Sequence, residues 1–387
     1  MFKIQTMNKI SPAGIETLEK NGCRVGENLD NPSGLLLRSA DLHDVSFPES
    51  LLAIARAGAG YNNIPVERCT EEGIVVFNAP GANAQAVKEQ EICSLVMASR
   101  DILGSIEWVH SISGEGENIP ALVEKKKASF TGPELLGKTL GVIGLGAVGA
   151  LVAHAGVDLN MRVLGYDPFL SVDAAWRLSR KVIHTENIEE LFENCDYISL
   201  NVPFTEDTRN MLNAEAFARM KDGVRIINES RAEVVNDEDM TEALKSGKVA
   251  KYVTDFPNEV ILRAPNVIAM PHLGACTPES EDRCAEMAAN ELDDYLLNGN
   301  IRNSVNFPDV YLNRLGVCRL RVIHRNVPRM ITRILDFISA RNINVEHMIN
   351  KHRGAYAVTI VDLGDAIYEE TVNGICEMDE VLRVRVI

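Results

Sequence analysis

A glycine-rich loop between a predicted strand and a predicted helix constrains the fold of this chain more than any other feature. The apolar strand 139–143 runs directly into Gly144-Leu145-Gly146-Ala147-Val148-Gly149, and a second strand ends in Asp167, about twenty residues further on. The first glycine permits a tight turn, the second lets the backbone approach a pyrophosphate, and the third lets helix and strand pack closely. The helix N-terminus offers unpaired N–H groups and the positive end of its dipole. This context predicts a doubly wound α/β domain that binds a dinucleotide, rather than a glycine turn of purely structural value.

Asp167 indicates which dinucleotide to expect. A carboxylate at the end of the second strand would bind the ribose hydroxyls of the adenosine, and its charge would repel a 2′-phosphate. We therefore expect NAD rather than NADP. The residues expected to hold it from this part of the chain are Gly144, Gly146, Ala147, Val148, Gly149 and Asp167.

The alternation of strands and helices extends over most of the chain. From 139 to 270 it is regular, with further strands predicted at 162–167, 197–201, 224–228, 249–255 and 267–269. Before this region, strands are predicted around 34–37, 51–55 and 74–77. Helices are predicted at 84–104, as one long connection, and at 277–298, while the polar stretch 111–136 is predicted to be a linker or surface excursion.

The end of the chain follows a different order. Strand, helix, strand, strand, helix and strand are predicted in turn at 316–323, 328–341, 343–348, 355–361, 366–376 and 381–387. This βαββαβ order is typical of a ferredoxin-like domain. We therefore expect a separate small domain over 313–387.

The charge balance narrows the range of partners. Against 39 Lys and Arg stand 55 Asp and Glu, and the resulting net charge of −16 would repel a nucleic acid. The start, MFKIQTMNKI, has no apolar run long enough for a signal peptide, and no stretch approaches the roughly 20 apolar residues of a membrane span. Eight cysteines stand singly, without a CxxC spacing. We therefore expect no metal site, reduced thiols, no nucleic-acid or membrane partner, and a cytoplasmic location.

Three later segments place reactive side chains after predicted strands. Arg231 follows the strand 224–228, where a guanidinium can hold a carboxylate and an adjacent carbonyl in a bidentate grip. Asp255 and Glu259 follow the next strand, and His272 follows the one after it. A histidine suits the transfer of a hydroxyl proton, and a carboxylate on its far nitrogen would orient it. Taken alone, Arg231 also fits an ordinary surface residue and His272 a structural one.

Taken together, these segments resemble the D-isomer-specific 2-hydroxyacid dehydrogenases over about residues 1–310. The resemblance is carried by the glycine loop, Asn-Glu-Ser-Arg at 228–231, Asp255, Pro-His-Leu-Gly-Ala at 271–275, and Asn-Val-Pro-Phe-Thr-x-x-Thr at 201–208. It implies that Arg231 binds the substrate carboxylate and carbonyl, that His272 is the general acid/base, and that Asp255 contacts the nicotinamide carboxamide. It also adds to the cofactor-binding residues Val202, Pro203, Thr208, Gly274 and Ala275.

The chain departs from the family pattern at two acids. The family usually reads Asp-Val-Phe-Glu-x-Glu-Pro, with the last glutamate pairing the catalytic histidine, whereas this chain reads Asp-Phe-Pro-Asn-Glu at 255–259, one residue short. Glu259 is the candidate orienting acid, although the register does not secure it. Glu229 stands where the family usually has a small or apolar residue, and the sequence offers no reason for it.

The segment 55–63, Ala-Arg-Ala-Gly-Ala-Gly-Tyr-Asn-Asn, resembles the family's substrate loop. Backbone N–H groups around Ala59 and Gly60 would hold the substrate carboxylate. In the members that act on D-3-phosphoglycerate, an arginine at the position of Arg56 contacts the phosphate, with help from a basic residue at that of Lys127. Lys127 also fits an ordinary solvated charge in a lysine run. Asn83 ends a family loop that packs against cofactor and substrate.

The C-terminal domain resembles the ACT domain of those same members. Where that domain binds L-serine, a histidine and two asparagines contact the effector across a dimer interface, and His324, Asn326 and Asn344 have the same spacing here. Arg329 replaces a glycine that normally follows the proline, and a larger side chain at that turn can block the pocket or change the ligand. The alternative is a domain that serves only for oligomerisation.

The resemblance as a whole implies three domains and one reaction. A Rossmann-type NAD-binding domain (93–282) is inserted in a flavodoxin-like substrate domain (1–92 and 283–310), and the ferredoxin-like ACT domain follows. The expected reaction is NAD-dependent oxidation of D-3-phosphoglycerate to 3-phosphohydroxypyruvate, the first step of L-serine biosynthesis, by a homodimer or homotetramer. The alternatives are a glyoxylate or hydroxypyruvate reductase of the same family, and a non-catalytic NAD-dependent sensor.

Overall fold

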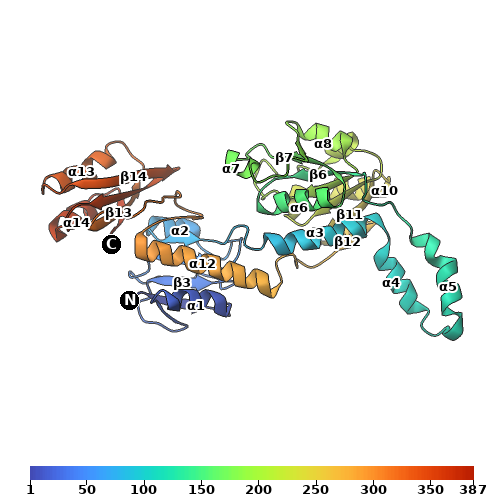
Figure 1. The fold of residues 1–387 in the computed structure, drawn as a ribbon, viewed down its shortest axis with the longest axis horizontal. Helices are drawn as coiled ribbons and strands as arrows, with labels where there is room; N and C mark the ends of the chain where they lie inside the picture. The colour runs from blue at the N-terminus through green and yellow to red at the C-terminus, as the bar shows by residue number, and fades with distance from the viewer. The chain divides into compact units, whose positions relative to one another are not determined.

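Three β-sheets organise the chain, two of them parallel and the third antiparallel (Figure 1). The computed structural model describes residues 1–387. The chain divides into two compact units, which are described separately below. Unit 1 comprises Met1–Asn83 and Pro278–Ile387, and unit 2 comprises Ala84–Thr277. The predicted α/β class with a C-terminal ferredoxin-like part is confirmed, whereas the predicted domain boundaries stay a prediction.

The sheet of unit 2 has seven parallel strands in the order β12-β11-β10-β9-β6-β7-β8. They are β6 (Thr139–Ile143), β7 (Arg162–Tyr166), β8 (Val182–His184), β9 (Tyr197–Leu200), β10 (Val224–Asn228), β11 (Val249–Thr254) and β12 (Val267–Ala269). The order reverses between β6 and β9, which is where doubly wound sheets bind their ligands. The sequence did not predict β8, because its three residues are short of a strand pattern and only partly buried.

Unit 2 has nine helices, and those that pack on the sheet cover both of its faces. The nine helices are α3 (Ala84–Ser99), α4 (Ile102–Ser111), α5 (Ile119–Lys126), α6 (Ala147–Asp158), α7 (Val172–Ala175), α8 (Ile188–Asn194), α9 (Ala214–Arg219), α10 (Asp237–Lys245) and α11 (Glu259–Leu262). Three short 3-10 turns are η1 (Gly116–Asn118), η2 (Lys127–Phe130) and η3 (Ala232–Val234). Successive strand residues point to opposite faces. Leu140 and Val142 therefore pack with α3 and α6, whereas Ile143 packs with α8, α9 and α10 on the other face.

One prediction for the segment 84–136 was wrong. The single helix predicted over 84–104 is broken, because the Asp101 side chain accepts a hydrogen bond from the Gly104 N–H and so caps a new helix, α4. The predicted linker contains α5, which has Pro120 in its first turn, so its polar composition did not exclude a helix. In Figure 1, α4 and α5 extend away from the seven-stranded sheet. Neither helix has a buried residue.

The N-terminal part of unit 1 has five parallel strands in the order β2-β1-β3-β4-β5. The strands are β1 (Lys3–Met7), β2 (Arg24–Gly26), β3 (Gly34–Leu37), β4 (Ala53–Arg56) and β5 (Val75–Phe77), and the helices are α1 (Pro12–Lys20), α2 (Val66–Glu71) and α12 (Pro278–Asn298). This strand order is that of flavodoxin-like sheets. Although α12 is distant in sequence, it packs on α1 and β4 and buries Leu292 and Leu296 in their core.

The C-terminal part of unit 1 is a four-stranded antiparallel sheet in the order β14-β15-β13-β16. Its elements are β13 (Cys318–Arg325), α13 (Met330–Ser339), β14 (Val345–Arg353), β15 (Tyr356–Leu363), α14 (Glu369–Cys376) and β16 (Val381–Val386). The predicted βαββαβ order is therefore confirmed. One face of the sheet packs on α13 and α14. The other face contributes Ile323, Val358 and Ile360 to the same core as Tyr295 of α12.

Arginines line the face of this sheet that meets the N-terminal part of unit 1. Arg319 is fully buried and pairs with Asp362 at 2.6 Å. The guanidinium of Arg321 lies 4.1 Å from the ring centroid of Tyr295, and Arg385 donates to the Tyr295 carbonyl at 3.0 Å. Because the apolar packing and the contacts of Arg321 and Arg385 with Tyr295 both cross to α12, the C-terminal sheet is an integral part of unit 1.

None of the helices in the structure combines the length and the apolar character that a membrane span requires.

Candidate active site

The glycine loop lies between β6 and α6, as predicted. Gly144 has φ +86°, a conformation that L side chains rarely adopt, and a methyl group there would overlap the carbonyl oxygen of Asn201. A methyl group on Gly149 would overlap the carbonyl oxygen of Gly144. By contrast, nothing lies within 4 Å of the position that a methyl group on Gly146 would take. The loop is therefore packed against backbone atoms at Gly144 and Gly149 and open at Gly146. Ala147 and Val148 follow Gly146 directly, at the N-terminus of α6.

Asp167 follows β7 and is built into the same loop. Its two carboxylate oxygens accept hydrogen bonds from the backbone N–H groups of Leu145 and Phe169, each at 2.9 Å. These bonds fix the carboxylate beside the glycine loop. Each oxygen keeps a further lone pair for an outside donor such as a ribose hydroxyl.

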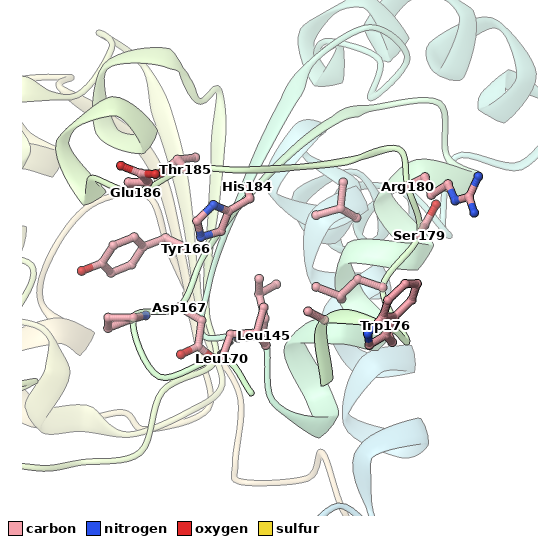
Figure 2. Close-up of a pocket in the computed structure, with 14 residues that line it drawn as sticks. Leu145, Tyr166, Asp167, Leu170, Trp176, Ser179, Arg180, His184, Thr185 and Glu186 are labelled. Carbon is pink, nitrogen blue, oxygen red and sulfur yellow. Dashed lines mark hydrogen bonds between the residues drawn. The ribbon is translucent and has the colours of Figure 1, made fainter. Parts of the chain in front are cut away.

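A cavity of about 800 Å³ opens next to Asp167 (Figure 2). Tyr166, Asp167 and His184, from the ends of β7 and β8, lie on one side of it, and Trp176 and Arg180 lie on the other. Its size is within the range of small-molecule sites. Of the lining residues, the sequence predicted only Asp167. The others lie mostly in the segment that follows the second strand of the dinucleotide-binding sheet, and this position could have indicated that they lie near the cofactor.

The motif at 201–208 follows β9, on the other side of the strand reversal. The Thr208 hydroxyl donates to the Pro203 carbonyl and accepts from the Thr205 N–H, both at 2.8 Å. These bonds fold the segment into a compact turn. Val202 is half-buried at its start, and its side chain lies next to Gly144.

Arg231 and His272 both lie near the aromatic ring of Phe256. The guanidinium of Arg231 is 6.0 Å from the centroid of the Phe256 ring, and the His272 ring is 4.7 Å from it, centroid to centroid. Asn228 is fully buried and donates to the Arg231 carbonyl at 2.9 Å, which fixes the backbone of the arginine. Both reactive side chains are exposed, so they are accessible to a ligand.

Asp255 lies beside the same two cations. Only 2% of it is exposed, and its Oδ1 has no hydrogen-bond partner. Burial raises the pKa of Asp255, and the positive charges of His272 and Arg231 oppose that rise. The structure thus brings together three of the residues predicted from separate strands.

Glu259 does not join them. It is the first residue of α11, its side chain is 77% exposed, and it pairs with Arg263 one turn further along the helix. Its predicted role in orienting His272 stays a prediction, and that role requires Glu259 to leave Arg263. Gly274 and Ala275 follow His272, and Gly274 is buried against Val87 of α3.

Two other acids are buried in unit 2, Glu91 on α3 and Glu229 after β10. The sequence flagged Glu229 but not Glu91. Glu91 lies four residues from both Val87 and Leu95, so it shares the apolar face of its helix. An acid on an apolar face indicates a buried carboxyl group, and this pattern could have identified Glu91 from the sequence.

The residues predicted to bind substrate divide between the two units. In unit 1, Arg56 ends β4, and its guanidinium folds back over the loop that contains Ala59 and Gly60. Asn78 holds this loop by donating to the Ala59 carbonyl at 2.6 Å, and Asn83 is half-buried at the end of the segment. In unit 2, Lys127 is exposed and pairs with Glu124.

The predicted effector residues of the C-terminal part differ in burial: His324 is buried, whereas the two asparagines are exposed. His324 is buried, and its ring nitrogens contact the Thr359 hydroxyl at 2.9 Å and the Arg325 carbonyl at 2.8 Å. Asn326 and Asn344 are exposed. Arg329 has φ +70°, so it takes the left-handed conformation that suits the glycine expected there.

Comparisons with known proteins agree with this architecture. Residues 94–274 match the family described as "D-isomer specific 2-hydroxyacid dehydrogenase, NAD binding domain". The chain is 32% identical to a D-3-phosphoglycerate dehydrogenase of Archaeoglobus fulgidus, over 80% of the chain and 60% of the relative. It is 30% identical to D-3-phosphoglycerate dehydrogenase 1 of Saccharomyces cerevisiae, over 81% of the chain and 68% of the relative.

A solved structure shows the same fold. The NAD+-bound 3-phosphoglycerate dehydrogenase of Entamoeba histolytica is 26% identical, with a TM-score of 0.60 over 79% of this chain and 98% of that one. The chain spans 50% to 60% of the length of the first curated relatives it matches. Sequence, fold and relatives point the same way: the chain belongs to the family of D-isomer-specific 2-hydroxyacid dehydrogenases.

Proposed function

We propose that this chain oxidises D-3-phosphoglycerate to 3-phosphohydroxypyruvate with NAD, the reaction that opens L-serine biosynthesis. The observation that carries the choice of substrate is Arg56. Its guanidinium lies over the loop of Ala59 and Gly60, which offers backbone N–H groups to a carboxylate. An arginine beside a carboxylate-binding loop suits a small molecule with two anionic ends.

The glycine loop of unit 2 fits the pyrophosphate of NAD. The side of the loop at Gly146 is open, and the N-terminus of α6 follows it directly. Asp167 would bind the adenosine ribose beside the cavity of Figure 2. Asp255, Gly274, Ala275 and the turn at 202–208 are the proposed contacts of the remaining cofactor. When bound, NAD supplies the acceptor for the hydride that leaves the substrate carbon.

The side chains of the protein handle the proton and the charge. Arg231 would grip the substrate carboxylate and the oxygen at C2, which becomes a carbonyl as the hydride leaves. His272 would take the hydroxyl proton during oxidation and return it during reduction. Lys127 would assist Arg56 with the phosphate, and Asn83 would pack against the substrate.

Steady-state assays across matched substrates test this assignment. We expect kcat/KM for D-3-phosphoglycerate to exceed that for D-glycerate, and 3-phosphohydroxypyruvate to be preferred over hydroxypyruvate and glyoxylate. Arg56→Ala should lower kcat/KM for the phosphorylated substrates by roughly 100-fold, because one charge-assisted contact is worth up to about 3 kcal/mol. Arg24→Ala, an exposed arginine of the same unit, should leave it unchanged. If the enzyme shows no preference for phosphorylated substrates, a glyoxylate or hydroxypyruvate reductase is favoured instead. If none of these substrates is turned over, a non-catalytic NAD-dependent sensor is favoured.

The C-terminal part would act as an ACT domain that binds L-serine through His324, Asn326 and Asn344. The support is its strand order, together with the two exposed asparagines. Binding by His324 requires it to exchange its contact with Thr359 for one with the effector. We expect heat on calorimetric titration with L-serine and inhibition of turnover. If titration gives no heat and L-serine does not inhibit turnover, a role in oligomerisation is the one that is left for this domain.

We further propose a homo-oligomer that forms through α4 and α5 and resides in the cytoplasm. Leu103, Ile106 and Val109 recur every three residues along α4 and are each more than 40% exposed, which is typical of a surface covered by a partner. All eight cysteines are free, in keeping with a reducing compartment. Light scattering should give a dimer or tetramer, and Ile106→Glu should shift it toward the monomer; a monomer at all concentrations would contradict the proposal.

A further inference from the structure

Two buried acids of unit 2 have no part in the reaction proposed above. Glu91 on α3 is 1% exposed and Glu229 after β10 is 7% exposed. The Ser199 hydroxyl donates to Oε2 of Glu91, and the Ser94 hydroxyl donates to Oε1 of Glu229 at 2.5 Å. The other oxygen of each carboxyl group has no hydrogen-bond partner. Burying an ionised carboxylate with one oxygen unpaired is costly, so an arrangement of this kind favours the protonated acids.

The charges around the two acids point the same way. Glu229 and Asp255 follow neighbouring strands at the same level, because Asn228 pairs with Thr254. Ser199, which donates to Glu91, lies on the next strand and pairs with Ile227. The carboxyl groups of Glu229 and Asp255 raise the pKa of Glu91, and that of Asp255 raises the pKa of Glu229. The basic groups of the cluster, His272 and Arg231, act on Asp255 instead, and the remaining titratable neighbour is the buried phenol of Tyr252. Asp255 is therefore the member of the three acids whose negative charge is compensated.

Burial is the first cause that raises both pKa values, and the neighbouring carboxyl groups add to it. The pKa of Glu91 is raised from 4.5 to about 8, and that of Glu229 from 4.5 to about 7. Hydrogen bonds to the two side chains oppose the rise without cancelling it. Both acids thus change charge in the range where a hydroxyacid dehydrogenase would work.

We propose that Glu229 is a positioning residue for proton transfer. In its protonated form it leaves Asp255 as the single anion beside His272 and Arg231. Glu91 is a second buried acid of the cluster that stays protonated. The proposal rests on the proposed function. When Glu229 ionises, a second negative charge enters the buried cluster. That charge drives a proton onto Asp255 or retains one on His272, and either change weakens the base that removes the hydroxyl proton of the substrate.

The pH dependence of oxidation tests the effect on the reaction. The kcat/KM of the wild-type enzyme should fall on the alkaline side, approaching roughly tenfold per pH unit as one required proton is lost. Glu229→Gln carries a permanently neutral group of the same shape and should lose this fall. Glu91→Gln should leave the position of this fall nearly unchanged, because Glu91, with a pKa of about 8, is still neutral when Glu229 ionises at about 7. Glu89→Gln is the matched control, since Glu89 is an exposed acid on the same helix, and its profile should match that of the wild type. If Glu229→Gln retains the alkaline fall of the wild type, the proposal is wrong.

A second measurement does not depend on activity. The pKa values of Glu91 and Glu229 in the folded state lie above the unfolded value of 4.5. The stability they contribute is therefore fully present below about pH 4.5 and is lost as pH rises through about 7 and 8. Urea unfolding should show this decline in the wild type and a flatter one in Glu229→Gln and Glu91→Gln, but not in Glu89→Gln.

Titration of the wild-type carboxyl carbons by NMR, with ¹³C-labelled glutamate, covers the case in which a variant does not fold. Because burial also raises the pKa of Glu291 on α12 to about 8, the signals of Glu91 and Glu229 must be assigned individually. Titration of these two side chains near or above neutrality supports the proposal, and titration of both near the ordinary glutamate pKa overturns it. If these glutamates titrate as expected but no 2-hydroxy acid is oxidised, the proposed function has failed and the proton-holding cluster stands. If the enzyme is active and the Gln variants change neither profile, the cluster has failed and the function stands.

Discussion

At the scale of single residues, the reactive side chains of unit 2 are held by neighbours that take no part in the chemistry. Asn228 fixes the backbone of Arg231, and the ring of Phe256 lies near both Arg231 and His272. Asp255 stays buried, with one oxygen unpaired, beside both cations. This arrangement makes the contribution of each side chain separable by mutation.

His272→Ala should lower kcat by roughly 10²- to 10⁴-fold, because it removes the proposed proton acceptor without touching the glycine loop. Binding of NAD, measured by calorimetry or by protein fluorescence, should stay nearly intact. His110→Ala, an exposed histidine on α4, is the control and should have wild-type turnover. Turnover unchanged in His272→Ala would remove this histidine from the mechanism.

Arg329→Gly should stabilise the protein, although it removes a charged side chain. Arg329 has φ +70°, and a left-handed conformation costs an L residue about 1–2 kcal/mol. Glycine avoids that cost but loses more backbone freedom on folding, so we expect a net gain of about 0.5–1 kcal/mol in the free energy of unfolding. Urea titration measures it, and a loss of stability would show that the Arg329 side chain makes a compensating interaction.

At the scale of elements, the site of unit 2 depends on how closely α6 approaches β6 and β9. The close contacts of Gly144 and Gly149 determine that approach, whereas Gly146 faces open space. The three glycines of the motif therefore have different structural roles. The first and third are required for packing, and the second is required only for access by the ligand.

Gly149→Ala and Gly146→Ala should consequently fail in different ways. The added methyl group in Gly149→Ala overlaps the Gly144 carbonyl and should lower the free energy of unfolding by about 1–3 kcal/mol, as overpacking does. Gly146→Ala should keep wild-type stability and lose affinity for NAD, because the methyl group occupies the path of the pyrophosphate. Thermal unfolding with and without NAD distinguishes the two, and equal stability in both variants would contradict this division.

At the scale of the whole molecule, the C-terminal sheet is joined to the rest of unit 1 by a shared core and by buried arginines. Ile323 and Val358 belong to the same apolar cluster as Tyr295, and Arg319 donates to the carbonyl of Asn298, the last residue of α12, at 2.8 Å. Ligand binding to the C-terminal sheet would therefore act on α12 through direct packing. We expect unit 1 to unfold as one cooperative body.

Asp362→Asn should destabilise unit 1 by about 3–5 kcal/mol, because it leaves the buried charge of Arg319 without its partner. The double variant Arg319→Met with Asp362→Leu should lie near the wild type, since apolar groups can replace a buried pair. Burial would raise the pKa of Asp362, but hydrogen bonds from Arg319 and from the Leu315 N–H hold it below its usual value. The stability from Asp362 is thus present above about pH 4 and is lost as pH falls further. Urea titrations at several pH values test both points, and a single variant as stable as the double one would contradict the first.

Sequence patterns determined the parts of this protein that depend on neighbours along the chain. The glycine loop, six strands of the seven-stranded sheet and the βαββαβ order at the C-terminus were predicted, because turn chemistry and apolar periodicity are local properties. The arginine and the histidine were also predicted, since each follows a strand. The break after Ser99 was missed because it depends on the cap that Asp101 forms.

Only the tertiary structure decided which side chains meet. It placed Glu91 and Glu229 with Asp255, although more than a hundred positions separate the first two in the sequence. It also buried His324 against Thr359. Spacing along a chain does not specify these contacts, because burial and the charges of distant strands set both the position of a side chain and its pKa. For the glycine loop, by contrast, the local pattern already predicted the role of each glycine, and the structure added the backbone atoms that Gly144 and Gly149 approach.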